Sequence, residues 1–250
     1  MSFDVWDLVL FIVVSTLTLG VAYMPDPRHK ALIMSLPLPS TAATLAVGSI
    51  GASNVAGFTL LLLFSWQVWF CCARCRMNII LSIALAAGVF CLLGKLLFPL
   101  IPDTEAGFWS VMVWNMVLGG ILFAAVPWKK EPAYKSPMPF WGKVPLVAGV
   151  VLLLIVMKKY MGGFIVAFPM VGVVGTYESR HALWGIARQV PLMMLSLGVL
   201  NTLARIALPY TGLYWALAVG WAGYCAVFFP LHRLLWRKSL AAAAEETPRA

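Results

Sequence analysis

Residues 79–101 read IILSIALAAGVFCLLGKLLFPLI, an apolar run in which Lys95 is the only charged side chain. A helix needs about 20 consecutive apolar residues to cross a bilayer, because each residue advances it by only about 1.5 Å. This run is long enough, and its composition leaves no polar face for water. It therefore predicts a transmembrane helix.

The rest of the chain repeats this pattern. Its 250 residues are 62% hydrophobic and 11% charged, with a mean hydropathy of +0.91, whereas about a quarter of an average soluble domain is charged. Apolar runs separated by Pro, Gly and charged residues predict spans near 5–24, 31–49, 54–73, 79–101, 107–128, 143–158, 161–177, 187–206 and 210–231. The predicted fold is an all-α polytopic membrane protein with about nine transmembrane helices.

The basic residues predict an orientation, because loops rich in Lys and Arg stay cytoplasmic. With the N-terminus outside and the C-terminus cytoplasmic, fourteen of the eighteen Lys and Arg residues fall inside. The expected location is a bacterial inner membrane, crossed many times. The formal charge of +9 is assigned to topology and to anionic lipid headgroups at the cytoplasmic basic loops. Nucleic acid is not an expected partner, because the chain has no reading motif.

An internal repeat is visible when the chain is shifted by 132 residues against itself. The shift places Leu36-Pro37 on Phe168-Pro169 and Thr44 on Thr176. Spans one to four then match spans six to nine, and the intervening fifth span makes the matched helices run in opposite directions. We expect two inverted four-helix repeats joined by a fifth helix. The expected segments are the repeats 1–104 and 143–236, a connecting helix with a basic Pro-rich linker at 105–142, and a short tail at 237–250.

The second repeat also carries a family resemblance. Residues 159–169 read KYMGGFIVAFP, and Gly172, Tyr177 and an apolar helix from Gly223 to Trp236 follow. This region resembles the GlpM family of small four-span bacterial inner-membrane proteins, and the whole chain resembles an inverted duplication of that unit. The activity of that family is poorly defined, so the resemblance implies an architecture rather than a reaction.

Two predicted spans are interrupted at matching places, by Pro37 and Pro39 in one repeat and by Gly162–Pro169 in the other. A broken helix leaves backbone groups that must be buried in protein or line a cavity. We expect a substrate path where the breaks meet. The candidate path residues are those of the breaks, nearby hydroxyls and intramembrane amides, namely Pro37, Ser40, Thr41, Thr44, Gly163, Pro169, Thr176, Asn115 and Asn201.

Each of these residues also has a purely structural interpretation. Hydroxyls near a proline can bond back to freed carbonyls, and intramembrane amides can join helices. Lys95, Glu178, Arg180 and His181 are the candidates for gating. Lys95 can instead extend to the outer interface, and Glu178 with Arg180 can form an ordinary interfacial ion pair.

No motif points to catalysis. Cys71, Cys72 and Cys75 lack a second pair of ligands at zinc spacing, and the sequence has no nucleophile elbow or phosphate loop. We expect no catalytic residue, metal or cofactor.

The expected function is transport or flipping of a small neutral or anionic solute, or of a lipid headgroup, at the repeat interface. The alternatives are a non-transporting scaffold or accessory subunit of envelope polysaccharide or lipid assembly, and a membrane-embedded transferase. The partners considered are the bilayer itself, a small-molecule or lipid substrate, and a second copy of the chain in a homodimer.

Overall fold

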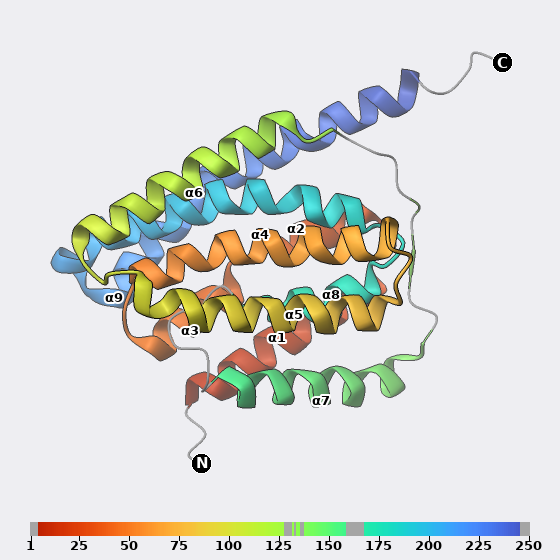
Figure 1. The fold of residues 1–250 in the computed structure, drawn as a ribbon, viewed down its shortest axis with the longest axis horizontal. Helices are drawn as coiled ribbons and strands as arrows, with labels where there is room; N and C mark the ends of the chain where they lie inside the picture. Colours follow the sequence, from red (N-terminus) through yellow and green to blue (C-terminus); the bar gives the residue numbers. More distant parts are fainter. Residues whose placement is uncertain (1–4, 128–131, 133, 136–137, 159–167, 246–250) are drawn as a thin grey trace.

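The protein is all-helical over the residues that the computed structural model describes, which are 1–250 without 1–4, 128–131, 133, 136–137, 159–167 and 246–250 (Figure 1). The helices are, in chain order, α1 (Val5–Tyr23), α2 (Pro27–Ser35), α3 (Leu38–Val47), α4 (Ala52–Ala73), α5 (Ile79–Leu97), the 3-10 turn η1 (Phe98–Leu100), α6 (Glu105–Ala125), α7 (Phe140–Lys158), α8 (Met170–Glu178) and α9 (Leu183–Glu245).

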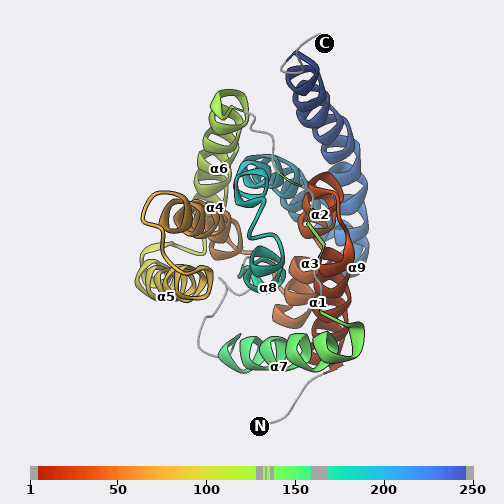
Figure 2. The same ribbon diagram turned by 90° about the vertical axis from the view of Figure 1, so that its right-hand side faces the viewer.

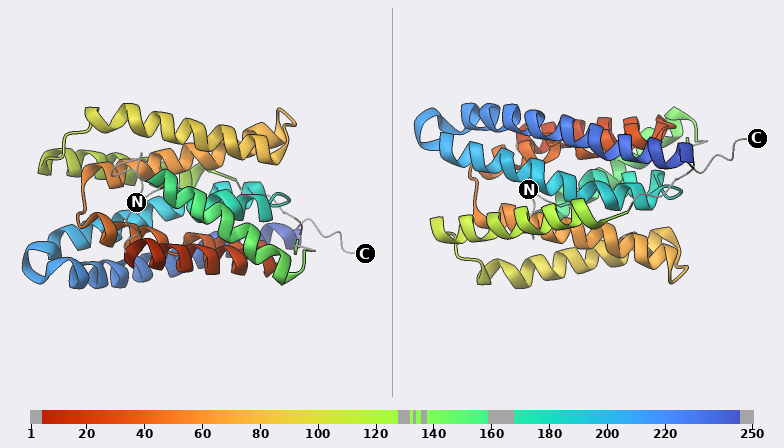
Figure 3. Two further views of the ribbon diagram at one scale, coloured as in Figure 1. Left: turned by 90° about the horizontal axis from the view of Figure 1, so that it is seen from below. Right: turned by 90° about the horizontal axis from the view of Figure 1, so that it is seen from above.

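Most helices run along the long axis of one bundle (Figure 3). Among the described residues, six helical stretches are long and apolar enough to cross a membrane: α1, α2 together with α3, α4, α5, α6 and residues 183–237 of α9. The protein is therefore a multi-pass membrane protein. The 55-residue stretch of α9 is far longer than the roughly 20 residues of one crossing, so it must turn back within the membrane or at its surface.

The turn in α9 lies at Gly212, whose φ of 73° and ψ of 169° are non-helical. It divides α9 into a first arm, residues 183–211, and a second arm, residues 213–245. The arms pack closely, since a Cβ atom on Gly220 would lie 2.6 Å from the Leu200 carbonyl oxygen. Glycine is needed there because any larger residue would push the two backbones apart.

The prediction of nine spans is too high, because the structure supports six to eight crossings. Two crossings come from the arms of α9, and α7 adds a shorter apolar helix, Phe140–Leu152. The predicted crossing over 161–177 is represented by α8, which has nine residues and spans roughly 14 Å of a 30 Å core. The rest of that predicted crossing lies largely outside the described residues.

The first predicted break is present between α2 and α3. Asp26 begins α2 by accepting a hydrogen bond from the Arg28 amide at 2.8 Å. The helix ends at Ser35, and Leu36 after it is extended, with φ −60° and ψ 128°, because the residue before a proline is pushed out of helical conformation. Pro37 then starts α3. In the same way Pro169 precedes α8, so both repeats begin a helix at a matched proline.

The two predicted repeat segments pack against each other. α1 packs against α7 and α8, and α4 packs against α9, so both segments share one bundle. Helices that match under the 132-residue shift run in opposite directions, as α1 does to α7 and α5 to the second arm of α9 (Figure 1). Helix α9 continues into the predicted tail at 237–250, as far as Glu245.

Candidate functional site

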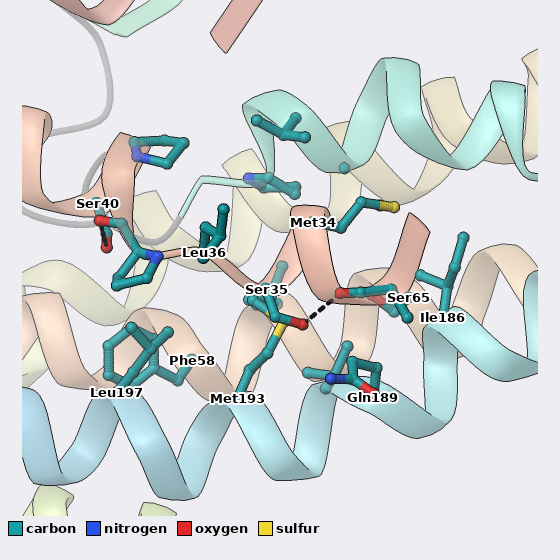
Figure 4. A pocket seen from close by; sticks show the side chains of 18 of the residues that line it. Met34, Ser35, Leu36, Ser40, Phe58, Ser65, Ile186, Gln189, Met193 and Leu197 are labelled. Carbon is teal, nitrogen blue, oxygen red and sulfur yellow. Dashed lines mark hydrogen bonds between the residues drawn. The ribbon is translucent and has the colours of Figure 1, made fainter. Parts of the chain in front are cut away.

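A cavity of about 80 Å³ lies between the two helix starts at Pro37 and Pro169. Figure 4 shows side chains of α2, α3, α4 and the first arm of α9 converging on it. Its α4 residues, Phe58, Leu61 and Ser65, occupy the middle of the helix Ala52–Ala73. The cavity is therefore near the middle of the predicted membrane span.

Repeat-matched residues line this cavity from both halves of the chain. Seven lining residues of the first half have a repeat-matched residue among the described ones, namely Leu36, Pro37, Pro39, Ser40, Phe58, Leu61 and Ser65. Adding 132 to each number gives Phe168, Pro169, Val171, Gly172, Val190, Met193 and Leu197. All seven of these residues also line the cavity. The other three first-half lining residues match 163, 166 and 167, which lie outside the described residues.

The breaks are also held in a reciprocal way. The second arm of α9 binds the first break, where the Tyr224 hydroxyl donates to the Ser35 carbonyl at 2.7 Å and Trp221 Nε1 donates to the Thr41 hydroxyl at 3.0 Å. α5 packs at the other break, where the Phe90 and Phe168 rings lie 5.3 Å apart. α5 and the second arm match under the shift, so each half supports the break of the other.

The cavity lining is mainly apolar, with a few neutral polar groups. Ser40 donates to the Pro37 carbonyl at 2.9 Å, and Gln189 Nε2 lies 3.2 Å from His232 Nδ1. The Gln189 Oε1 atom is buried and has no hydrogen bond within the described chain. Ser65 and Thr176 add two hydroxyls, and none of the described lining residues is charged. Such a surface suits an uncharged ligand or water better than an ion.

Four of the predicted path residues line the cavity: Pro37, Ser40, Pro169 and Thr176. Thr41 and Thr44 do not, and their hydroxyls donate to the carbonyls of Pro37 at 2.7 Å and Ser40 at 2.8 Å. These two satisfy backbone groups near the break, which is the structural interpretation of such residues. Gly163 lies outside the described residues.

The two intramembrane amides do not line the cavity. Asn115 accepts a hydrogen bond from the Thr59 hydroxyl at 3.1 Å and donates to the Val111 carbonyl at 2.9 Å, which joins α6 to α4. Asn201 donates to the Leu197 carbonyl of its own helix at 2.8 Å. In this conformation both residues serve helix structure and packing.

A buried charge cluster lies at the end of the bundle where α2 begins and α8 ends. Lys143 Nζ lies 2.8 Å from Glu178 Oε2, with side-chain exposures of 2% and 3%. Lys30, which is also buried, donates to the Glu178 backbone carbonyl at 3.0 Å. Buried charges are stable only when they are paired and hydrogen-bonded, so Glu178 organises two lysines from separate helices.

Tyr134 of the linker covers this cluster. Its ring lies 5.3 Å from Lys30 Nζ and 4.7 Å from the Arg180 guanidinium carbon, and its hydroxyl accepts a hydrogen bond from Arg180 Nη2. The His181 ring lies 4.4 Å from the same ring. The Tyr134 amide also donates to the Pro25 carbonyl at 3.1 Å, so this part of the linker is docked on the bundle.

The predicted gating residues are therefore only partly brought together. Glu178, Arg180 and His181 share the cluster, whereas Lys95 is exposed in the last turn of α5. Lys30 and Lys143 were missed, because basic residues near span ends suggest topology signals, and Tyr134 of the linker was missed as well. The cavity residue Gln189 was also missed, although a glutamine in an apolar run was a usable signal.

The cluster lies directly beside the cavity along the chain. Lys30 precedes the lining residue Ala31, and Glu178 follows the lining residue Thr176 by two positions.

At the other end of the bundle, Arg205 Nε donates to Glu105 Oε1 at 3.2 Å, and Arg205 Nη1 donates to the Ile50 carbonyl at 2.6 Å. Ionic contacts therefore join helices at both ends.

The described residues contain no group of three or more His, Cys, Asp or Glu side chains that could hold a metal ion. Comparisons with protein-family models, with curated proteins and with solved structures found no match for this chain. The resemblance to the GlpM family therefore stays a prediction.

Proposed function

We propose that this chain is a transporter-like or flippase-like protein of the bacterial inner membrane, built as an inverted duplication, with its C-terminus cytoplasmic. One observation carries the proposal: seven cavity-lining residues of the first half have repeat-matched residues that line the same cavity. A pseudo-two-fold axis in the membrane plane would pass through such a site. That is where inverted-repeat transporters bind their substrates.

The packing supports an exchange between two states. Each half of the chain packs against the break of the other half. Rocking one half against the other would therefore replace the contacts at one break by the matched contacts at the other. Helices broken near the membrane centre also present backbone groups to a substrate without requiring an ionisable side chain.

The lining indicates the class of substrate. No charged residue is among the described lining residues, and the polar groups are hydroxyls and one amide. We therefore favour a small uncharged solute over an anion or a charged lipid headgroup. A cavity of about 80 Å³ has space for several water molecules and is smaller than the roughly 300 Å³ of drug-sized pockets. This conformation would thus be a closed state.

The charge cluster supplies a way to close one side of the path. Lys30, Lys143 and Glu178 join α2, α7 and the end of α8 beside the cavity. Opening that side requires at least one of these contacts to separate, so the cluster would act as a gate toward the end of the bundle that the basic residues place in the cytoplasm.

Cysteine accessibility tests the proposal. Ser65→Cys and Leu197→Cys, which are matched by the repeat, would be made singly in a background without the native cysteines. Both positions line the cavity. We expect a small membrane-impermeant thiol reagent to modify both in oriented vesicles, because a transport path must admit water.

Ala86→Cys is the matched control, since Ala86 is buried in α5 and is absent from the cavity lining. It should react much more slowly than both test positions. If Ser65→Cys and Leu197→Cys are as inert as Ala86→Cys from both faces of the membrane, the path does not exist, and a non-transporting scaffold becomes the better interpretation.

A further inference from the structure

A second cavity, of about 220 Å³, is separate from the proposed path. It lies where α6 ends and where the second arm of α9 approaches the start of the first arm, at the end of the bundle that Figure 2 faces. Its walls are Phe123 to Pro127, Arg188, Leu234 and Leu235. Arg188 is the only charged residue among these described walls.

Arg188 is buried, and no ion pair or hydrogen bond of its side chain is found among the described residues. The residue is only 8% exposed, and its Nε atom is inaccessible and makes no hydrogen bond within the described chain. No carboxylate is among the described residues that line the cavity. A guanidinium cannot lose its proton in a protein, so a buried one without a partner is strongly unfavourable.

Hydrogen bonds hold the helix segment around Arg188 in place. Trp184 Nε1 donates to the Pro127 carbonyl at 3.0 Å, which ties the end of α6 to the start of α9. Trp66 Nε1 donates to the Ala187 carbonyl at 3.0 Å, directly before Arg188. Arg188 is therefore held beside the cavity by a helix that is hydrogen-bonded to its neighbours, rather than by a mobile loop.

We propose that this cavity binds the phosphate of an anionic phospholipid, with Arg188 as its principal ligand. A guanidinium pairs with a phosphate through two parallel hydrogen bonds, which would supply the missing counter-charge. Phe123, Leu234 and Leu235 give the adjoining acyl chains an apolar wall. The exposed Arg233 and Arg237 attract anionic headgroups to the same end. The proposal does not rest on the transport function.

The first test measures binding to the full-length protein after its native lipid has been removed. Short-chain phosphatidylglycerol should bind, whereas diacylglycerol with the same chains should not, because it lacks the phosphate. Arg188→Gln should weaken phosphatidylglycerol binding by about ten- to hundredfold, as expected for loss of a charged, bidentate contact. Arg74→Gln, a matched change of an exposed arginine at the end of α4, should leave binding within about twofold, since exposed charges contribute little.

A binding measurement with inorganic phosphate alone distinguishes a free phosphate ion from a lipid phosphate as the ligand of this cavity. If it binds as tightly as phosphatidylglycerol and Arg188→Gln abolishes both, the site takes a free anion and the lipid assignment is overturned. If Arg188→Gln binds phosphatidylglycerol as well as the unmodified chain does, the site itself is overturned.

A second measurement distinguishes loss of the binding site from misfolding of the Arg188→Gln variant. In lipid-free detergent, Arg188→Gln should raise the melting temperature, because it removes an unpaired buried charge. The same variant should lose the increase in melting temperature that phosphatidylglycerol gives the unmodified protein. A merely structural arginine would give the opposite sign in the first measurement, and that result would contradict the proposal.

Discussion

The two ends of the bundle are both joined by ionic contacts, but they differ in burial. At one end Lys143 and Glu178 are 2% and 3% exposed, and Tyr134 lies over the neighbouring Lys30. At the other end Arg205 and Glu105 are 26% and 67% exposed. The same chemical pairing is therefore buried in protein in one place and open to the surroundings in the other.

This difference predicts that the two ends respond unequally to the same substitution. Removing one partner of a buried pair leaves a charge that water cannot reach, which costs about 3–5 kcal/mol. Removing one partner of an exposed pair leaves a charge that solvent screens, and the cost is about 0–1 kcal/mol. The buried pair should therefore contribute more to the stability of the bundle than the exposed pair.

Glu178→Gln should give the largest effect. It removes the buried carboxylate that pairs with Lys143 and weakens the cluster around Lys30, so the free energy of unfolding should fall by about 3–5 kcal/mol. Reversible unfolding in mixed detergent micelles would measure this loss. A loss as small as that of an exposed ion pair would show that the cluster is solvated in the membrane-embedded protein.

The double variant Lys143→Met with Glu178→Gln is the control for an unpaired charge. Because both charges are removed together, part of the stability lost in Glu178→Gln should return. If the double variant is less stable than the single one by the full cost of Lys143→Met, the two side chains do not act as a pair.

Tyr134→Phe should give an intermediate effect at the same end. The aromatic ring beside Lys30 and Arg180 is kept, while the hydroxyl that accepts a hydrogen bond from Arg180 is lost. The expected loss is about 1 kcal/mol, close to that of one hydrogen bond. Hydrogen exchange of the Tyr134 amide, which donates to the Pro25 carbonyl, would show whether the linker still docks. An unchanged unfolding free energy would mean that the hydroxyl adds nothing.

Glu105→Gln should give the smallest effect, about 0–1 kcal/mol. Arg205 keeps its hydrogen bond to the Ile50 carbonyl, so the helix ends stay joined. The same unfolding titration provides the comparison with Glu178→Gln. A loss equal to that of the buried glutamate would remove the distinction between the two ends.

Much of the helical architecture could be predicted from local sequence. Apolar runs such as 79–101 are long enough to cross a bilayer, and Leu36-Pro37 must leave the helical conformation because proline restricts the residue before it. The count failed at α8. Hydropathy alone does not separate a nine-residue helix from a full crossing, nor does it find the end of α9 at Glu245.

The candidate site was predicted only at its breaks. Pro37, Ser40, Pro169 and Thr176 line one cavity, and each has a sequence signal of its own. Asn115 and Thr44 carried equally strong signals, yet they bond to neighbouring backbone or helices. Residue type shows that a polar group needs a partner, but it does not show which partner the fold will supply.

The sequence by itself determined that this is a multi-pass helical protein and where its second span breaks, because both follow from chain length, hydropathy and the fixed φ of proline. Only the tertiary structure decided which charges are buried. Lys30 lies more than a hundred residues before Lys143, and Lys143 lies tens of residues before Glu178. These three residues become partners only when α2, α7 and α8 pack together. The energy of a charge depends on the dielectric around it, which the fold creates.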